Sequence, residues 1–258
     1  MDNMRIIEKL PNAPLQEVIF EIRWDPDVDQ ETNQPLDLGY ELAQGLFAES
    51  VAKILSYHKR LAAPSIPVFS PYMLAHQFWK SNGEWPVVQL GPCIMTVNDI
   101  GKNYIWQSSF KPLTVTMLDI LQKSYKKPIR FNSVSLRYVD AVDLPSVPNA
   151  SVQAFIEDNF KLKLNREYAV EGALNDINIT EVYLLPDGTN LNITVASGTH
   201  GVKISPAIIW QTAVTKSAST TSNDIVEWLE MVHNVVSSLF KSMLKDHFYE
   251  SFRKLPGS

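Results

Sequence analysis

Apolar and polar residues alternate near the start of the chain. From Val18 to Trp24 every second side chain is apolar, and most of those between are charged. A period of two is typical of a strand with one buried face, so we predict a strand over 15–24. The range 39–60 has apolar residues at helical spacing, which predicts a helix. The proline- and aromatic-rich range 62–86 predicts an ordered, irregular crossing rather than a flexible linker.

A hairpin is the next predicted feature. Extended patterns cover 87–97 and 102–110, and the residues Asn98-Asp99-Ile100-Gly101 between them include types that tolerate the positive φ of a turn. Pro112 suits the first turn of a helix to about Tyr125, and 129–144 is extended again. The order strand, helix, strand, strand, helix, strand is compatible with a ferredoxin-like βαββαβ arrangement.

Three strands joined by short turns are predicted in the second half. Pro145 and Pro148 indicate a corner, and Ser151 is a candidate N-cap of a short helix to about Phe160. The predicted strands cover 168–185, 190–197 and 202–216, with a turn at Pro186-Asp187-Gly188. A meander is the simplest arrangement of such strands.

The last predicted element is a long helix that begins near Thr221 and reaches about Arg253. Its apolar stripe, which should lie across the sheet, consists of Ile225, Leu229, Val232, Val236, Leu239 and Met243. After that the apolar positions rotate to Leu244, Phe248 and Phe252. Two explanations stay open: the helix breaks near Lys245, or its end projects and buries these three residues against another chain.

The patterns together predict one α+β domain over residues 1–258, with a subdivision near 145–150 as the alternative. Its sheet is mainly antiparallel, with a ferredoxin-like first half and then a three-strand meander, and the long C-terminal helix covers it.

Composition restricts the classes of function. Hydrophobic residues make up 45% of the chain and the net charge is -5, so a packed core is expected and nucleic acid is not an expected partner. No apolar run approaches the ~18 residues that span a membrane. The lone Cys93 forms no internal disulfide and no signal peptide is recognised, which together predict a cytoplasmic protein.

Candidate chemistry is sparse. Glu230 and His233 have the i, i+3 spacing by which one helix offers two ligands to a carboxylate-bridged metal centre, but a second such motif on a facing helix is missing and a solvated flank is the ordinary explanation. Cys93 heads an apolar run and is expected to be a packed cysteine. We therefore assign no catalytic residue, no metal and no cofactor. Five tryptophans, with nearby tyrosines, either fill the core or line a pocket: Trp79, Trp85, Trp106, Trp210 and Trp228.

Three segments carry a resemblance. They are Leu10-Pro11-Asn12-Ala13-Pro14-Leu15 with the strand that follows, Gly91-Pro92 with the stretch to Trp106 and Phe110, and Leu136-Arg137-Tyr138-Val139-Asp140. Together they resemble a sporadically distributed family of bacterial and archaeal proteins of about this length without an assigned function. The resemblance implies no site residues. Its patchy distribution implies an accessory gene of mobile or defence clusters.

Two functions are predicted as alternatives. The first is a non-enzymatic interaction or assembly module that associates with itself or with a partner protein, motivated by Leu244, Phe248 and Phe252 as interface candidates. The second is a small-molecule-binding protein or hydrolase with a pocket between the long helix and the sheet, motivated by the tryptophans.

Overall fold

The computed structural model describes residues 9–61, 70–102, 104–145, 151–168, 170–172, 174–201, 204–217 and 220–254. The helices are α1 (Tyr40–Val51), α2 (Lys111–Ser124), α3 (Val152–Asn159), α4 (Ser222–Met243) and α5 (Asp246–Ser251), and a π-helical turn, η1 (Trp106–Phe110), leads into α2. The main strands are β1 (Leu15–Trp24), β4 (Tyr57–Arg60), β5 (His76–Trp79), β6 (Val87–Gly91), β7 (Ile94–Ile100), β8 (Phe131–Asp143), β9 (Asn178–Leu184), β10 (Asn190–His200) and β11 (Ser205–Lys216). A separate small ribbon consists of β2 (Asp27–Val28) and β3 (Pro35–Leu36).

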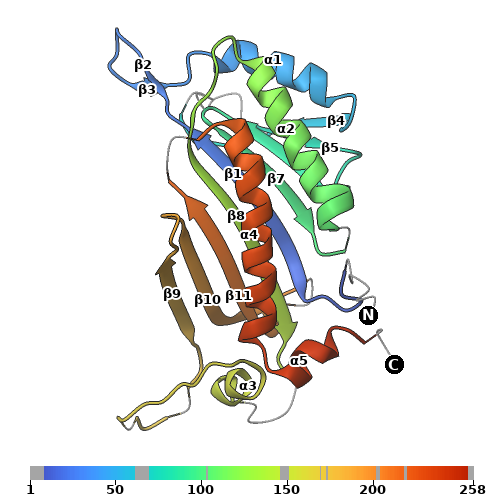
Figure 1. Cartoon of the computed structure of the whole chain (residues 1–258), viewed down its shortest axis with the longest axis vertical. Coiled ribbons are helices and arrows are strands. Elements are labelled where there is room, and N and C mark those ends of the chain that lie inside the picture. Colours follow the sequence, from blue (N-terminus) through green and yellow to red (C-terminus); the bar gives the residue numbers. More distant parts are fainter. Residues whose placement is uncertain are drawn as a thin grey trace.

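A single 9-stranded sheet forms the centre of the molecule, in the order β4-β5-β6-β7-β1-β8-β11-β10-β9. All neighbouring strands are antiparallel. Figure 1 shows α1, α2 and α4 on one face of this sheet. The predicted α+β fold with a mainly antiparallel sheet and a C-terminal helix is therefore confirmed. Strands from both halves of the chain share the sheet, and residues 146–150, where a subdivision was the alternative, lie outside the described residues.

The first half has the strand order β6-β7-β1-β8. Because β7 is antiparallel to both β6 and β1, the strands β1 and β6 run parallel with one strand between them. The same holds for β7 and β8, which β1 separates. These split crossovers are those of the ferredoxin-like arrangement, here extended at one edge by β4 and β5.

The second half repeats the plan of the first. Each half starts with a central strand (β1 or β8), passes through a helix, returns by a meander whose last strand pairs with that central strand, and ends in a helix (α2 or α4). The predicted meander is β9-β10-β11. Its first strand begins at Asn178 rather than at 168, and Pro186-Asp187-Gly188 forms the predicted turn, with Gly188 at φ 80°.

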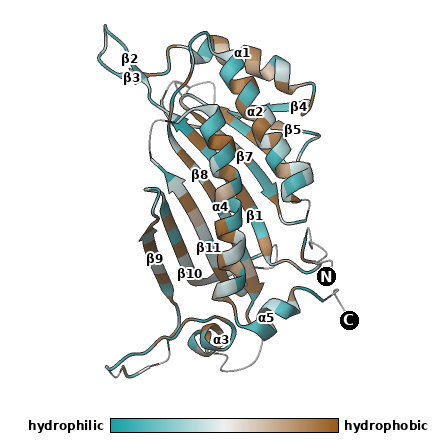
Figure 2. Ribbon diagram, in the orientation of Figure 1, coloured by the Kyte–Doolittle hydropathy of each residue, from teal (hydrophilic) through white to brown (hydrophobic). Residues whose placement is uncertain are grey.

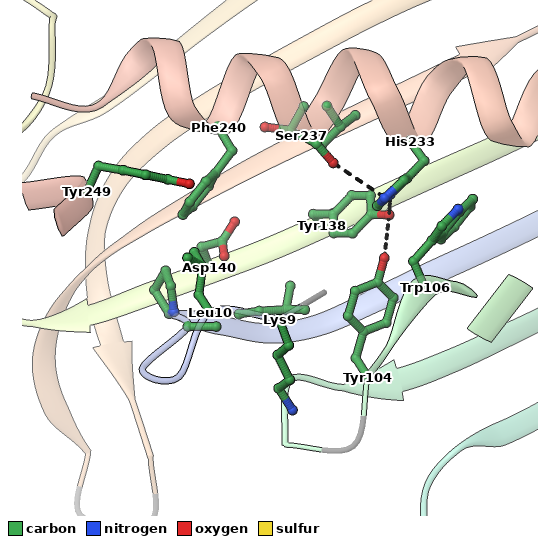
Figure 3. Close-up of a pocket in the computed structure, with 16 residues that line it drawn as sticks. Lys9, Leu10, Tyr104, Trp106, Tyr138, Asp140, His233, Ser237, Phe240 and Tyr249 are labelled. Atoms are coloured by element: carbon green, nitrogen blue, oxygen red, sulfur yellow. Dashed lines mark hydrogen bonds between the residues drawn. The ribbon is translucent and has the colours of Figure 1, made fainter. Parts of the chain in front are cut away.

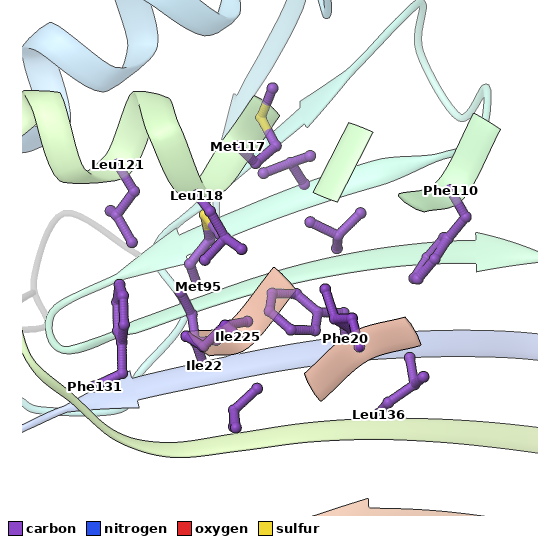
Figure 4. Close-up of a cluster of buried hydrophobic side chains, with 14 of the residues drawn as sticks. Phe20, Ile22, Met95, Phe110, Met117, Leu118, Leu121, Phe131, Leu136 and Ile225 are labelled. Atoms are coloured by element: carbon purple, nitrogen blue, oxygen red, sulfur yellow. The ribbon is translucent and has the colours of Figure 1, made fainter. Parts of the chain in front are cut away.

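The core lies between the sheet and the helices that cover it. Figure 2 shows hydrophobic residues along the central strands beneath α2 and α4. The buried core residues labelled in Figure 4 come from β1, β7, η1, α2, β8 and α4, and they include Phe20, Ile22, Met95, Phe110, Met117, Leu118, Leu136 and Ile225. Among the helices in the described ranges, none is both long and apolar enough to cross a membrane.

The predicted hairpin was wrong. The chain turns instead at Pro92-Cys93, between β6 and β7, where Cys93 has φ 59°, and residues 106–110 are helical. Asn98 and Asp99 lie within β7. Gly101 is required for a different reason, because a Cβ there would lie 1.8 Å from the carbonyl oxygen of Leu15.

The predicted helix over 39–60 was too long. α1 ends at Val51, and residues 57–60 form the edge strand β4. His58 therefore lies on β4, with its Nε2 atom 2.8 Å from Nδ1 of His76 on β5. Part of the predicted irregular crossing is likewise the strand β5, and residues 62–69 lie outside the described residues.

The C-terminal helix begins where the sequence predicts and ends earlier. Thr221 and Asp224 form a reciprocal capping box, in which each side chain accepts a hydrogen bond from the other residue's backbone N–H. The helix ends at Met243 because Leu244 is extended and pairs with Phe160, just after α3. The backbone N–H of Lys245 donates to the Asn159 carbonyl at 2.8 Å. Of the two explanations for the shifted stripe, the break near Lys245 is the one observed.

Candidate functional site

A pocket of about 270 Å³ lies between α4 and the sheet. Its walls come from the segment 9–15, the start of η1 and the residues just before it, the strands β8 and β11, and the helices α4 and α5. Figure 3 shows side chains of these elements directed toward a common space. The backbone N–H of Asn12 donates to the carbonyl of Phe252 at 3.0 Å, which joins the segment after residue 9 to the C-terminal region beside the pocket.

Asp140 lies at the floor of this pocket. Its position on β8 is between Leu15 of β1 and Trp210 of β11, on the face of the sheet that packs against α4. The residue is only 5% exposed, and no described residue donates a hydrogen bond to its carboxylate or forms an ion pair with it. Burial raises the pKa of this carboxyl to about 8, because the ionised form loses its hydration. At neutral pH the group is therefore mostly protonated.

Two tyrosines and a histidine form a hydrogen-bonded chain beside Asp140. The hydroxyl oxygens of Tyr104 and Tyr138 are 2.8 Å apart, and the Tyr138 hydroxyl lies 2.9 Å from Nδ1 of His233 (Figure 3). Burial lowers the pKa of His233 to about 4 and raises the pKa of both tyrosines. All three side chains are thus uncharged at neutral pH, and the chain offers polar but neutral contacts to the pocket.

Trp106 forms a further wall and holds the imidazole in place. Its ring stacks on His233 with centroids 4.0 Å apart and an interplanar angle of 8°. Trp106 begins the π-helical turn η1, and such turns occur often at functional sites. The indole N–H also donates to Glu230 at 3.3 Å, so that η1 is tied to α4.

The metal candidates Glu230 and His233 have separate partners. Lys111 donates to the Glu230 carboxylate at 2.6 Å and lowers its pKa, whereas His233 contacts Tyr138. Within the described ranges, no group of three or more His, Cys, Asp or Glu side chains is placed to hold a metal ion. His233 lines the pocket as a neutral hydrogen-bonding group rather than lying on a solvated flank.

The interface candidates Leu244, Phe248 and Phe252 lie inside the molecule. Leu244 is 0% and Phe252 4% exposed, and with Phe248 they pack in a second apolar cluster that includes Phe160 and Trp210. The Phe248 ring is 5.7 Å from that of Phe160. Since α5 turns these side chains inward, the rotated stripe reflects an intramolecular contact, and the reason for placing an interface there is removed.

The other candidates of the sequence lie elsewhere. Of the tryptophans expected to fill the core or line a pocket, Trp106 lines this pocket, while Trp210 packs in the second cluster and Trp79 packs against Trp85. Cys93 is buried, its backbone N–H donates to Asp37 at 3.0 Å, and burial raises the pKa of its thiol. A protonated, buried thiol is a packed group rather than a nucleophile.

No family model, no curated protein sequence and no solved structure matches this chain significantly. The resemblance to the sporadic prokaryotic family therefore stays a prediction. Its three segments nevertheless meet at one place, because Leu10 and Pro14 of the first, Trp106 of the second, and Tyr138 and Asp140 of the third all line the pocket.

Sequence reasoning missed Tyr104, Tyr138 and Asp140. A signal for Asp140 was present, because it continues the buried phase of β8 after Leu136 and Tyr138. An acidic residue on the apolar face of a strand is unusual enough to mark a site. Tyr104 carries no such signal, since only the tertiary fold brings it to Tyr138.

Proposed function

We propose that the protein binds a small molecule in the pocket between α4 and the sheet. The observation that supports this most directly is the Asp140 carboxyl, which is buried without a partner from the described residues and is directed toward α4 in Figure 3. Because Asp140 lines the pocket, a ligand there would supply the polar contact that the described residues do not give its carboxyl.

Binding suits the geometry better than hydrolysis. The hydroxyl of Ser237 is 3.5 Å from Nε2 of His233, but Nδ1 of that ring contacts the Tyr138 hydroxyl rather than a carboxylate that would orient and activate it as a base. Apolar walls with a few convergent polar groups are instead typical of ligand sites. At about 270 Å³ the pocket is slightly smaller than most drug-sized sites, so the ligand is compact.

A fragment screen followed by protein NMR tests this function. We expect hits of any chemistry to shift the signals of Tyr104, His233 and Val236, and the Ser237→Phe variant to abolish those shifts by filling the pocket from α4. Ser238→Phe is the matched control, because Ser238 is exposed on the same helix and does not line this pocket. Fragments that bind Ser237→Phe and the wild type equally would contradict the proposal.

Self-association is a second candidate function, now for a different surface. β9 is an edge strand, and Val182 and Leu184 on it are 64% and 74% exposed. Exposed apolar edge strands are templates for pairing with another chain.

We also propose a cytoplasmic location, for which the lone Cys93 is the support. An accessory role in a mobile or defence gene cluster is a further proposal, and it rests on the resemblance alone.

A further inference from the structure

Among the described residues, Asp140 has no basic partner. Two lysines lie near the pocket, but Lys111 donates to Glu230 at 2.6 Å and Lys9 donates to the carbonyl of Lys102 at 2.6 Å. In Figure 3 the Lys9 side chain extends away from Asp140. Neither lysine is therefore placed to pair with Asp140 when its carboxyl ionises.

Aromatic rings surround the space above this acid. They belong to Tyr104, Trp106, Tyr138, Phe240 and Tyr249. The face of an aromatic ring is electronegative, and it attracts a cation more strongly where water is excluded. An acidic group beside several aromatic rings favours a cation with an apolar body over a neutral or anionic molecule.

We propose that the pocket binds an organic cation, a protonated primary or secondary amine whose ammonium group pairs with Asp140 and whose compact apolar body lies against the aromatic rings. This inference rests on the proposed function and specifies the ligand class of the same site. A carboxylate ligand would instead lie against the electronegative faces of the aromatic rings, and Lys9, the described lysine that lines the pocket, donates to the carbonyl of Lys102.

Proton release should accompany binding. In the empty pocket burial raises the pKa of Asp140 to about 8, and an ammonium beside it favours the ionised carboxylate. Below that pH each bound cation displaces one proton, so the affinity should increase by up to about tenfold per pH unit between about pH 6 and about pH 8. The other ionisable side chains that face the pocket are those of Lys9, Tyr104, Tyr138, His233 and Tyr249.

Calorimetric titration with three matched probes tests the ligand class. The probes are phenethylammonium, its neutral counterpart 2-phenylethanol and the anionic 3-phenylpropionate. We expect phenethylammonium to bind most tightly and its affinity to fall about tenfold or more in Asp140→Asn, because a charge-assisted hydrogen bond is lost. The affinity of 2-phenylethanol should be unchanged by that substitution, and Ser237→Phe should block both.

The pH dependence in the wild-type protein provides a second measurement that needs no variant. The inference is supported if the cation binds more tightly as the pH rises. It also predicts that the observed binding enthalpy changes with the ionisation enthalpy of the buffer, because the buffer takes up the released proton. Equal binding of the cation and the alcohol at every pH overturns the ligand class and leaves the pocket as a binding site. Failure of every probe overturns the ligand class as well, while the fragment screen separately decides whether the pocket binds anything.

Discussion

At the scale of single residues, the unusual feature is a carboxyl group held where an apolar side chain is expected. Asp140 occupies the buried phase of β8 and takes no hydrogen bond from a described residue. Its raised pKa means that the folded state keeps a proton that the unfolded chain loses near its ordinary pKa of 3.8. The folded state is therefore penalised at neutral pH, which is a common property of groups kept for binding rather than for stability.

Replacing Asp140 by Asn should stabilise the protein at high pH. Between about pH 4 and about pH 8 the free energy of unfolding of the wild type decreases as the pH rises, because Asp140 holds a proton in the folded state that it has lost in the unfolded state. Asn cannot ionise, so the advantage of the variant should grow across this window and level off above it. Urea unfolding at several pH values measures it, and a pH-independent difference would be inconsistent with a buried, unpaired acid.

Removing the Tyr138 hydroxyl should be costly. The Tyr138→Phe variant leaves the Tyr104 hydroxyl and His233 without their shared partner, and we expect a loss of about 1–3 kcal/mol in the free energy of unfolding. The control is Tyr183→Phe, whose hydroxyl bonds Glu181 at the surface and should contribute little. Chemical denaturation of both variants gives the comparison, and equal losses would argue against the hydrogen-bonded chain.

At the scale of elements, local patterns predicted those segments whose burial follows a regular period. β1, α2 and β8 match because one face of each packs on the core, and α4 begins directly after its N-cap Thr221 because of the capping box. The hairpin prediction failed because residues 98–100 continue β7, and the chain after Gly101 leads into η1 instead of a second strand. The end of α4 is set by a bridge from Leu244 to Phe160, residues distant in sequence, which no local pattern contains.

The buried stripe of α4 should carry most of its contribution to stability. Leu229 is 0% exposed, and Leu229→Ala should lower the free energy of unfolding by about 2–5 kcal/mol, from lost burial and the cavity that remains. Met231 on the same helix is 39% exposed, so Met231→Ala is the matched control and should change stability by less than about 1 kcal/mol. Thermal and urea unfolding would show the difference, and similar effects would mean that α4 does not pack as described.

At the scale of the whole molecule, two halves of similar plan share one sheet through the pairing of β1 with β8. The sequence shows no repeat because the halves have in common only the order of elements and the buried positions, not residue identities. The pocket likewise needs the whole fold, since segment 9–15, η1, β8 and α4 supply its walls. From the sequence, a pocket lined by tryptophans was one of two alternatives, the other being a filled core, and Asp140 at its floor was not predicted.

The free edge at β9 gives a prediction at this scale. If the chain associates with itself, the double variant Val182→Lys, Leu184→Lys should convert a dimer or larger species to a monomer, because added lysines on an edge strand oppose pairing. Both side chains are more than half exposed, so stability should be unaffected. Light scattering coupled to size-exclusion chromatography measures the change, and a wild-type chain that is already monomeric would exclude this candidate function.

The protonation state of Asp140 tests most directly whether this carboxyl is a buried acid without a partner in the empty pocket. A carbon-13 NMR titration of its side-chain carboxyl, assigned by comparison with Asp140→Asn, should give a midpoint at about 8 in the ligand-free protein. A midpoint at about 4 would show that the group is hydrated or already paired, and would contradict a buried acid waiting for a cationic partner.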